Sequence, residues 1–305
     1  MLQTPVLFII FNRPKQTSVT FNAIRAQKPK QLFVAADGPR ADHQDDEAQI
    51  AACKAIIKAV DWDCEIKTHY RDKNLGCGAG PADAITWFFS HVEEGIILED
   101  DCVANPSFFD FCTVLLQRYR DTEQVMMICG TSYQPAPLDT TSYYFSKYPH
   151  VWGWASWRRA WSRYNFVLDY ENESAITEII ARTFINKRER IKWIYNMNLI
   201  KTGLDAWDYQ WMYWIWKNNG LCITPWRNMI SNIGFGVHAT HTFDAASKQA
   251  EMLQYELTGI VHPAIVKQHQ QADAYERFHI LIDPLPVIYR RKFQSVINRI
   301  KNVFS

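Results

Sequence analysis

The sequence has little of what marks membrane, secreted or nucleic-acid-binding proteins. No uncharged apolar run comes near the ~18 to 20 residues that cross a bilayer, so we expect no transmembrane segment. The short apolar run near the start has no basic stretch before it and no small-residue cleavage site after it. We therefore expect no signal peptide and a cytoplasmic location. The formal net charge is only +1, so no overall field draws the chain to nucleic acid.

Paired cysteines are also lacking. The seven cysteines form no C-x-x-C pair and no cluster with histidine, so we expect reduced thiols and no structural zinc. The composition, 48% hydrophobic and 21% charged, excludes disordered and collagen-like chains. The 305 residues allow one large domain or a domain with an elaborated second half.

Short apolar runs alternate with helix-length stretches through the first 130 residues. The expected strands are 6–11, 32–36, 65–70, 96–98 and 125–129. The expected helices are 15–27, 45–60, 82–91 and 108–120. Such alternation predicts βαβ units and a parallel sheet, with ligands at the carboxyl ends of the strands.

Polar segments follow the first four expected strands. They are Asn12-Arg13-Pro14, Asp37-Gly38-Pro39-Arg40, Arg71-Asp72-Lys73-Asn74-Leu75-Gly76 and Glu99-Asp100-Asp101. Each of the first two, taken alone, is more typical of an ordinary turn. Together they predict one crevice at the edge of the sheet.

The acidic triplet Glu99-Asp100-Asp101 carries the strongest chemical signal. It directly follows the apolar segment Gly-Ile-Ile-Leu, so like charges gather at the end of a buried strand. Their repulsion is costly unless a cation offsets it, and oxygen ligands suit Mg²⁺ or Mn²⁺. The alternative is a solvated acidic turn, which an isolated triplet would favour.

These segments resemble the nucleotide-sugar-dependent glycosyltransferases of the GT-A fold, whose D-x-D or E-D-D motif ends a central strand. The resemblance lies in FNRP, ADGPR, RDKNLGCGAG and ILEDD. WGWASWRRAW, WDYQW and NIGFGVHATHT are similar to segments of bacterial glycosyltransferases of the hemolytic-protein-like group, which are distantly similar to N-acetylglucosaminyltransferase I. The resemblance covers about residues 5 to 245.

The resemblance implies roles for particular residues. The nucleotide would be bound by Arg13, Asp37, Gly38, Arg71, Asn74, Gly76 and Asp100. Asp101 would ligate the metal, and Glu99 would lie near the donor or acceptor sugar. The Gly76-Cys77-Gly78-Ala79-Gly80 run would bring backbone N–H groups close to an anion, although such glycine runs often only turn the chain.

Tryptophan is concentrated in the second half, where ten of the twelve lie between Trp152 and Trp226. Aromatic faces pack on the apolar faces of sugars, so Trp154 and Trp207 are candidate contacts of the acceptor or donor sugar. The spacing from Trp152 to Trp161 is near-helical, which favours a packed aromatic core that shapes the pocket.

The resemblance makes Asp208 the candidate catalytic base, and its segment, Asp205 to Trp211, opens an apolar helix among aromatic residues. Burial raises the pKa of a carboxyl group and a helix N-terminus lowers it, which leaves a charged but reactive base. The alternative is that Asp205 or Asp208 only caps this helix. A base at Asp208 would imply inversion at the sugar.

Two features near the end of the chain are weaker signals. The resemblance makes His241 a second metal ligand, in preference to His238, whereas a lone loop histidine is more often just surface. Residues 287–305 carry five basic and no acidic side chains with apolar residues at helical spacing. They predict a basic amphipathic helix, either in peripheral contact with the inner face of the membrane or packed on the protein.

We expect a GT-A α/β fold in which a mostly parallel sheet flanked by helices precedes an aromatic-rich, helical acceptor-side half. The expected parts are a nucleotide-sugar half (1–130), an acceptor half of the same domain (131–284) and the C-terminal helix (285–305). The expected activity is Mn²⁺- or Mg²⁺-dependent transfer from a UDP-sugar to a glycan or lipid-linked glycan hydroxyl. The alternatives are a sugar nucleotidyltransferase, a retaining transferase and a non-catalytic glycan-binding protein.

Overall fold

The computed structural model describes residues 1–168, 173–235 and 252–282, and the strands form one large sheet and one small one. The large sheet has eight strands in the order β3-β2-β1-β4-β8-β6-β9-β7. Its strands are β1 (Val6–Ile10), β2 (Gln31–Ala36), β3 (Glu65–Tyr70), β4 (Glu94–Glu99), β6 (Val125–Cys129), β7 (Tyr143–Ser146), β8 (Trp154–Trp157) and β9 (Leu221–Pro225). The small sheet pairs β5 (Cys102–Ala104) with β10 (Ile230–Asn232) in antiparallel register.

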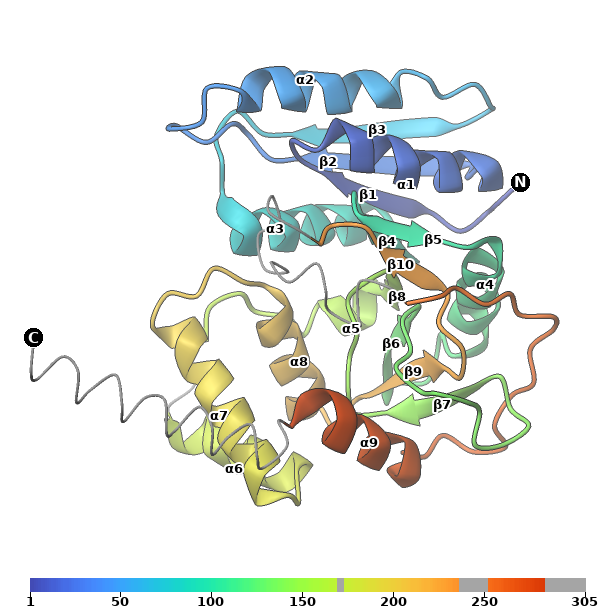
Figure 1. Cartoon of the computed structure of the whole chain (residues 1–305), viewed down its shortest axis with the longest axis vertical. Helices are drawn as coiled ribbons and strands as arrows, with labels where there is room; N and C mark the ends of the chain where they lie inside the picture. The colour runs from blue at the N-terminus through green and yellow to red at the C-terminus, as the bar shows by residue number, and fades with distance from the viewer. Residues whose placement is uncertain (169–172, 236–251, 283–305) are drawn as a thin grey trace, which may run out of the picture.

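The large sheet is mostly parallel. β1 pairs in parallel with β2 and with β4, and β2 pairs in parallel with β3. β8 runs antiparallel to both of its neighbours, β4 and β6, and β7 runs antiparallel to β9 at the edge. In Figure 1 the strands descend from β3 to β7, and the carboxyl ends of β1, β2 and β3 point to the left. All five strands expected from the sequence are present.

Nine α-helices lie among the described residues. They are α1 (Pro14–Gln27), α2 (Asp46–Ile57), α3 (Gly76–His91), α4 (Pro106–Arg118), α5 (Arg158–Trp161), α6 (Glu173–Thr183), α7 (Lys187–Lys201), α8 (Asp208–Lys217) and α9 (Gln270–Glu276), the last continuing into a π-helical turn (Arg277–Leu281). Pro14 and Pro106 begin their helices, where a missing N–H costs nothing. The expected α/β fold, with a mostly parallel sheet flanked by helices and an aromatic-rich helical second half, is confirmed.

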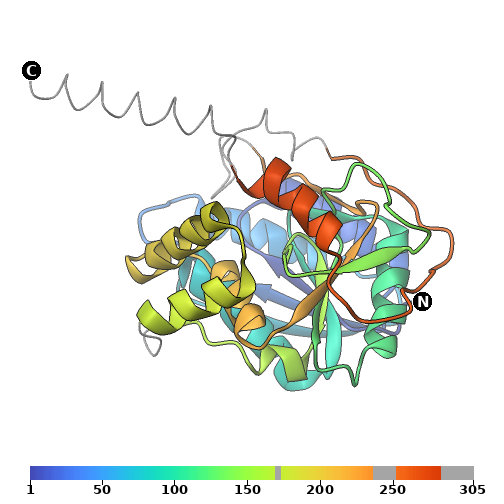
Figure 2. The same ribbon diagram turned by 90° about the horizontal axis from the view of Figure 1, so that it is seen from below.

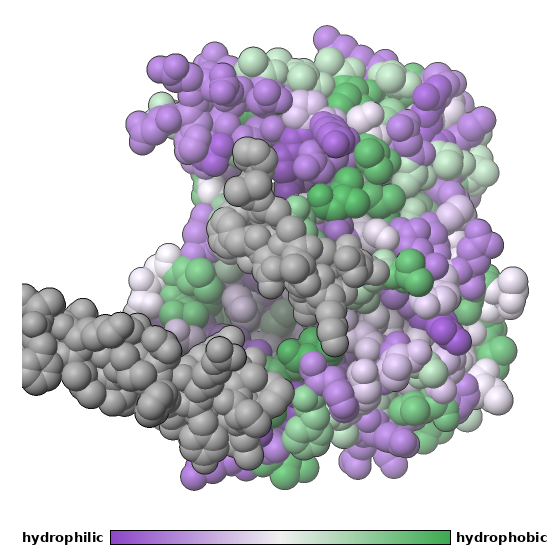
Figure 3. Space-filling view, viewed as in Figure 1, coloured by the Kyte–Doolittle hydropathy of each residue, from purple (hydrophilic) through white to green (hydrophobic). Residues whose placement is uncertain are grey.

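Alternation along the strands divides the core between the two faces of the sheet. Val6, Phe8 and Ile10 of β1 pack in one apolar cluster with side chains of α1, α2 and α4. Leu7 packs in a second cluster with side chains of α3, α5, α6, α7 and α8. The loops after β2 and β3 form a hydrophilic surface at the upper left of Figure 3, beside the carboxyl ends of the strands.

The tryptophan-rich segment is not the helix that its spacing suggests. Trp154 and Trp157 are the two ends of strand β8, and only the four-residue α5 follows. Because side chains alternate along a strand, the two rings lie on opposite faces, Trp154 with the α3 and α8 side chains and Trp157 with those of α4. The near-helical spacing was therefore misleading, whereas the aromatic core that it suggested is present.

The two halves of the chain share the large sheet. β8, from the second half, lies between β4 and β6 of the first. The division at residue 130 remains a prediction, and the predicted C-terminal helix, 285–305, lies outside the described residues. All seven cysteines are free. In the described part of the chain, no helix combines the length and apolar character needed to cross a membrane.

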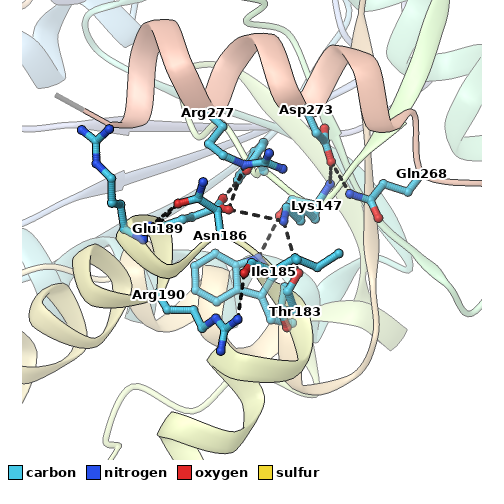
Figure 4. Close-up of polar contacts among 12 residues, drawn as sticks. Lys147, Thr183, Ile185, Asn186, Glu189, Arg190, Gln268, Asp273 and Arg277 are labelled. Carbon is cyan, nitrogen blue, oxygen red and sulfur yellow. Dashed lines mark hydrogen bonds and ion pairs between the residues drawn. The ribbon is translucent and has the colours of Figure 1, made fainter. Parts of the chain in front are cut away.

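A buried ionic network attaches α9 to the rest of the second half (Figure 4). Glu189 of α7 has no exposed surface and accepts a hydrogen bond of 3.0 Å from Nε of Arg277. Its Oε2 lies 3.8 Å from Nζ of Lys147, and it also accepts a bond from the hydroxyl of Tyr148. Asp273 of α9 accepts a bond of 2.7 Å from Oγ of Ser146 in β7. Nothing in the sequence pointed to these long-range pairs.

Candidate functional site

The acidic triplet lies where the sequence places it, at the carboxyl end of β4, and Arg13 binds it. Nε of Arg13 lies 3.4 Å from Oδ2 of Asp100, and its Nη2 pairs with Oδ1 of the same carboxylate. Its Nη1 lies 3.0 Å from Oδ2 of Asp101. Oγ1 of Thr20 donates to the carbonyl oxygen of Asp100 at 2.8 Å. The loop after β1 is thereby joined to the end of β4.

The charges at this point do not balance. Burial, and then the neighbouring carboxylates Asp101 and Asp100, raise the pKa of Glu99 to about 8. Burial also raises the pKa of Asp100, to about 6, although Arg13 opposes this shift. Three carboxylates thus face one guanidinium in a poorly solvated place. An added cation would offset the excess negative charge, so the residues fit a divalent metal.

Of the two aspartates in the triplet, Asp101 is the more accessible to a ligand, and its role as a metal ligand remains a prediction. Its side chain is 13% exposed, against 3% for Asp100. The small sheet brings Gly234 so close that a Cβ there would lie 2.0 Å from Oδ2 of Asp101. His241, the second predicted ligand, lies outside the described residues. Within residues 1–168, 173–235 and 252–282, no three His, Cys, Asp or Glu side chains form a ready-made metal cluster.

The loops after β2 and β3 meet at Asp37. Its carboxylate accepts backbone N–H bonds from Gly38 at 2.9 Å, Leu75 at 2.8 Å and Gly76 at 3.1 Å. Nδ2 of Asn74 donates to the carbonyl oxygen of Gly38 at 2.8 Å. Burial raises the pKa of Asp37, while these N–H bonds oppose the rise. Four residues predicted to bind the nucleotide thus come together, although their contact with a nucleotide remains a prediction.

Arg71 is directed toward α3. Its Nε lies 2.8 Å from Oδ2 of Asp83, which also lies 2.7 Å from Nε2 of His69. Burial raises the pKa of Asp83, but the bonds from Arg71 and His69 lower it further, so the net shift is downward. Asp83 was not predicted from the sequence, and its only signal there is that His69 and Arg71 are two residues apart at the end of β3 and so point the same way.

A second missed residue, Asp46, joins the loops after β1 and β2. Its Oδ1 accepts a bond of 2.7 Å from Nδ2 of Asn12, and its Oδ2 accepts one of 2.8 Å from Nε of Arg40. The Arg40 bond is the largest of the effects that hold the pKa of this carboxyl well below its usual range. Asp46 therefore fixes two of the four polar strand ends relative to each other.

The glycine-rich start of α3 binds an anion that belongs to the protein. The carboxylate of Asp205 accepts N–H bonds of 2.9 Å from both Cys77 and Gly78. Gly76 has φ +87°, and a Cβ on it would lie 2.3 Å from Oδ2 of Asp205. Asp205 thus caps α3, 127 residues away, rather than the helix that follows it in sequence. We call these contacts the Asp205 clamp.

Asp208, the predicted base, is the first residue of α8, three residues beyond the Asp205 clamp. Its charge contributes to the rise in the pKa of Glu99, after burial and the larger effects of Asp101 and Asp100. Burial raises the pKa of Tyr164 and of Tyr209, and the charge of Asp208 contributes to both shifts. Asp208 therefore begins α8 between the aromatic residues Trp207 and Tyr209, and its role as the base remains a prediction.

The two predicted sugar contacts, Trp154 and Trp207, are buried. Trp154 has no exposed area and Trp207 is 5% exposed. Their rings stack with centroids 5.8 Å apart. The burial and the stacking of the two rings favour a role in packing over direct contact with a sugar. Because Trp207 precedes Asp208, its burial fixes the start of α8.

Comparison with known proteins yields structural likeness only. No family model and no curated protein matches the sequence. The inositol-1-phosphate CTP transferase from T. maritima is 7% identical, with 74% of this chain and 86% of that chain covered and a TM-score of 0.39. An apo UDP-glucose pyrophosphorylase is 10% identical (76% and 93% covered, TM-score 0.36). Mouse xyloside xylosyltransferase 1 is also 10% identical (70% and 81% covered, TM-score 0.34). Likeness this distant carries no conclusion about activity, which has to be argued from the site.

Proposed function

We propose that the protein is a metal-dependent glycosyltransferase that moves a sugar from a nucleoside-diphosphate donor, a UDP-sugar, to a hydroxyl of a glycan or lipid-linked glycan. The observation that carries the proposal is the meeting of Arg13 with Asp100 and Asp101 at the carboxyl end of β4. Ligands of open α/β sheets bind at such strand ends.

On the donor side, the partly exposed groups are those that a ligand can reach. The side chain of Arg13 is 23% exposed and that of Asp101 13%. Arg13 would bind the nucleotide, and the loops joined at Asp37 would lie along its base and ribose. Asp100 is enclosed and held by Arg13, so its predicted ribose contact requires the guanidinium to turn away from it.

Asp101 would hold Mn²⁺ or Mg²⁺ together with the donor's own phosphate oxygens. When bound, the metal would stabilise the negative charge that gathers on the departing diphosphate. Without the metal, Asp101 forms an ion pair with Arg13 and so helps to hold the guanidinium beside Asp100.

Asp208 would act as the base toward the acceptor. The acceptor oxygen forms a bond to the anomeric carbon, the bond from that carbon to the diphosphate breaks, and the hydroxyl proton passes to the Asp208 carboxylate. Attack from the face opposite the diphosphate inverts the anomeric centre. A product with the donor's own configuration would indicate the retaining alternative.

Calorimetric titration tests the proposal. UDP, GDP, CMP and ADP are titrated with and without Mn²⁺ into wild type, Asp101→Ala and the control Asp110→Ala, which removes an exposed carboxylate from α4. We expect metal-dependent binding of one nucleoside diphosphate that Asp101→Ala loses and Asp110→Ala keeps. Binding of none of them would refute the proposal and favour a glycan-binding protein. Release of pyrophosphate from a nucleoside triphosphate and a sugar phosphate would establish the nucleotidyltransferase instead.

A further inference from the structure

A cavity of about 210 Å³ lies between α7, α8, the end of α9 and the loop joining β7 to β8. The side chains that matter for its chemistry are Tyr133, Tyr148, His150, Trp193, Met212 and Glu276. Neither the acidic triplet nor the nucleotide loops contribute to it. It lies beside the ionic network of Figure 4, since Tyr148 lines the cavity and bonds Glu189 of the network.

Two polar groups on the cavity wall have no hydrogen-bond partner in the part of the chain that the structure describes. They are the indole Nε1 of Trp193 and Oε2 of Glu276. Trp193 is 4% exposed and Glu276 has no exposed surface. The other oxygen of Glu276, Oε1, forms an ion pair with Nε2 of His150 at 3.0 Å. Buried polar groups are nearly always paired, so an orphaned donor and an orphaned acceptor on one cavity point to a missing partner.

The chemistry of the wall selects the partner. A hydroxyl group both donates and accepts, so neighbouring hydroxyls on one ring can serve Glu276 and Trp193 together. The Tyr133 ring, at 87° to His150 with centroids 4.9 Å apart, and the Tyr148 ring supply the aromatic surface that suits the apolar faces of a sugar. The volume is below the ~300 to 1,000 Å³ of drug-sized pockets and fits one small ring.

The cavity is also close to the proposed base. Met212 on its wall and Asp208 are four residues apart in α8, so they lie on the same side of the helix. Four residues of helix rise about 6 Å, which is about the size of one sugar ring.

We propose that this cavity binds one neutral sugar ring of the acceptor, with the Glu276 carboxylate accepting from its hydroxyls and the Trp193 indole donating to one. The assignment to the acceptor rests on the proposed function, whereas binding of a sugar ring does not.

Saturation-transfer NMR of the full chain tests the proposal, with methyl glycosides of glucose, galactose, mannose and N-acetylglucosamine as probes. The variants are Glu276→Gln, which replaces the charged acceptor, and Trp193→Phe, which removes the N–H and keeps an aromatic ring. The control is Trp214→Phe, because Nε1 of Trp214 donates to the carbonyl of Asn165 away from the cavity. Binding of UDP with Mn²⁺ is measured in parallel.

We expect at least one glycoside to bind wild type and Trp214→Phe alike, and to bind each cavity variant about tenfold more weakly, as the loss of one such bond implies. If Glu276→Gln does not fold, Trp193→Phe alone decides. A wild type that binds no glycoside, which would mean that water fills the cavity, overturns the proposal, and so does binding that both cavity variants leave unchanged. Glycoside binding without nucleotide binding would keep the sugar site and refute the transferase.

Discussion

Replacing Gly78 by alanine should destabilise the protein, although the same change inside a helix usually stabilises it. Alanine is favoured over glycine by roughly 0.5–1 kcal/mol in a helix interior. At Gly78, however, the added Cβ would lie 2.5 Å from Oδ1 of Asp205 and 2.8 Å from the backbone nitrogen of Ala206. Both partners belong to the short segment before α8, so the Asp205 clamp must open to admit the methyl group.

The magnitude follows from the bonds that the clamp contains. Two N–H groups, of Cys77 and Gly78, donate to the Asp205 carboxylate, each at 2.9 Å. A bond to a charged group contributes about 1.5–3 kcal/mol, and the lower end applies because the clamp is partly open to solvent at Cys77. The loss of both, less the gain in helix propensity, leaves a net destabilisation of about 2 kcal/mol.

Urea unfolding followed by circular dichroism measures the effect, with Asp205→Ala and the double variant as companions. Gly78→Ala should cost less stability in the Asp205→Ala background than in wild type, because the clamp bonds are already gone and only the close contact with the Ala206 backbone remains. Transfer activity should fall about 100-fold in each, since Asp208 lies three residues beyond Asp205 and a displacement of about 1 Å suffices. A Gly78→Ala protein as stable as wild type would refute the reasoning.

Three further outcomes are expected. Glu189→Gln leaves Arg277 without its buried partner and should lower the free energy of unfolding by about 3–5 kcal/mol. Asp61→Asn, which breaks the exposed pair with Arg25, should change the free energy of unfolding little. Equal effects of the two variants would contradict this expectation. Burial lowers the pKa of His150, but the ion pair with Glu276 more than offsets this and raises it to about 8, above the unfolded value of about 6.5. The stabilisation by protonated His150 is therefore complete below pH 6.5 and lost as the pH rises through 8. In urea unfolding, the difference in free energy of unfolding between wild type and His150→Gln should shrink by about 2 kcal/mol over that window. A difference that does not change with pH would contradict the raised pKa of His150. Asp208→Asn should lower kcat by a factor of about 10²–10⁴ and leave the affinity for the nucleotide, measured by calorimetry, unchanged. A loss of nucleotide affinity in this variant would show that Asp208 has a different role.

The sequence was most informative about residues that directly follow a strand recognisable from its apolar run. The run Gly-Ile-Ile-Leu is apolar throughout because β4 is buried on both faces, so the carboxylates that follow had to lie at a strand end. The meeting of Arg13 with Asp100 follows from the parallel pairing of β1 and β4, which brings their carboxyl ends together.

Partners far apart in the chain could not be predicted in the same way. Asp205 has the spacing of a cap for α8, and only the packing of the two halves shows that it caps α3. The glycines at 76 and 78 indicated that the start of α3 binds an anion, but not that this anion is the carboxylate of Asp205. The near-helical spacing of Trp154 and Trp157 failed because a residue pair three apart fits a helix face and also the two faces of a strand.

The position of β8 bears on how the chain folds as it is synthesised. Ile97 of β4 pairs with Leu7 of β1 on one side and with Trp154 of β8 on the other. A nascent chain that ends near residue 130 lacks β8 and would therefore carry β4 with one open, apolar edge, which is a template for pairing with other chains. We therefore expect the sheet of the first half to be completed only after the tryptophan-rich segment has left the ribosome.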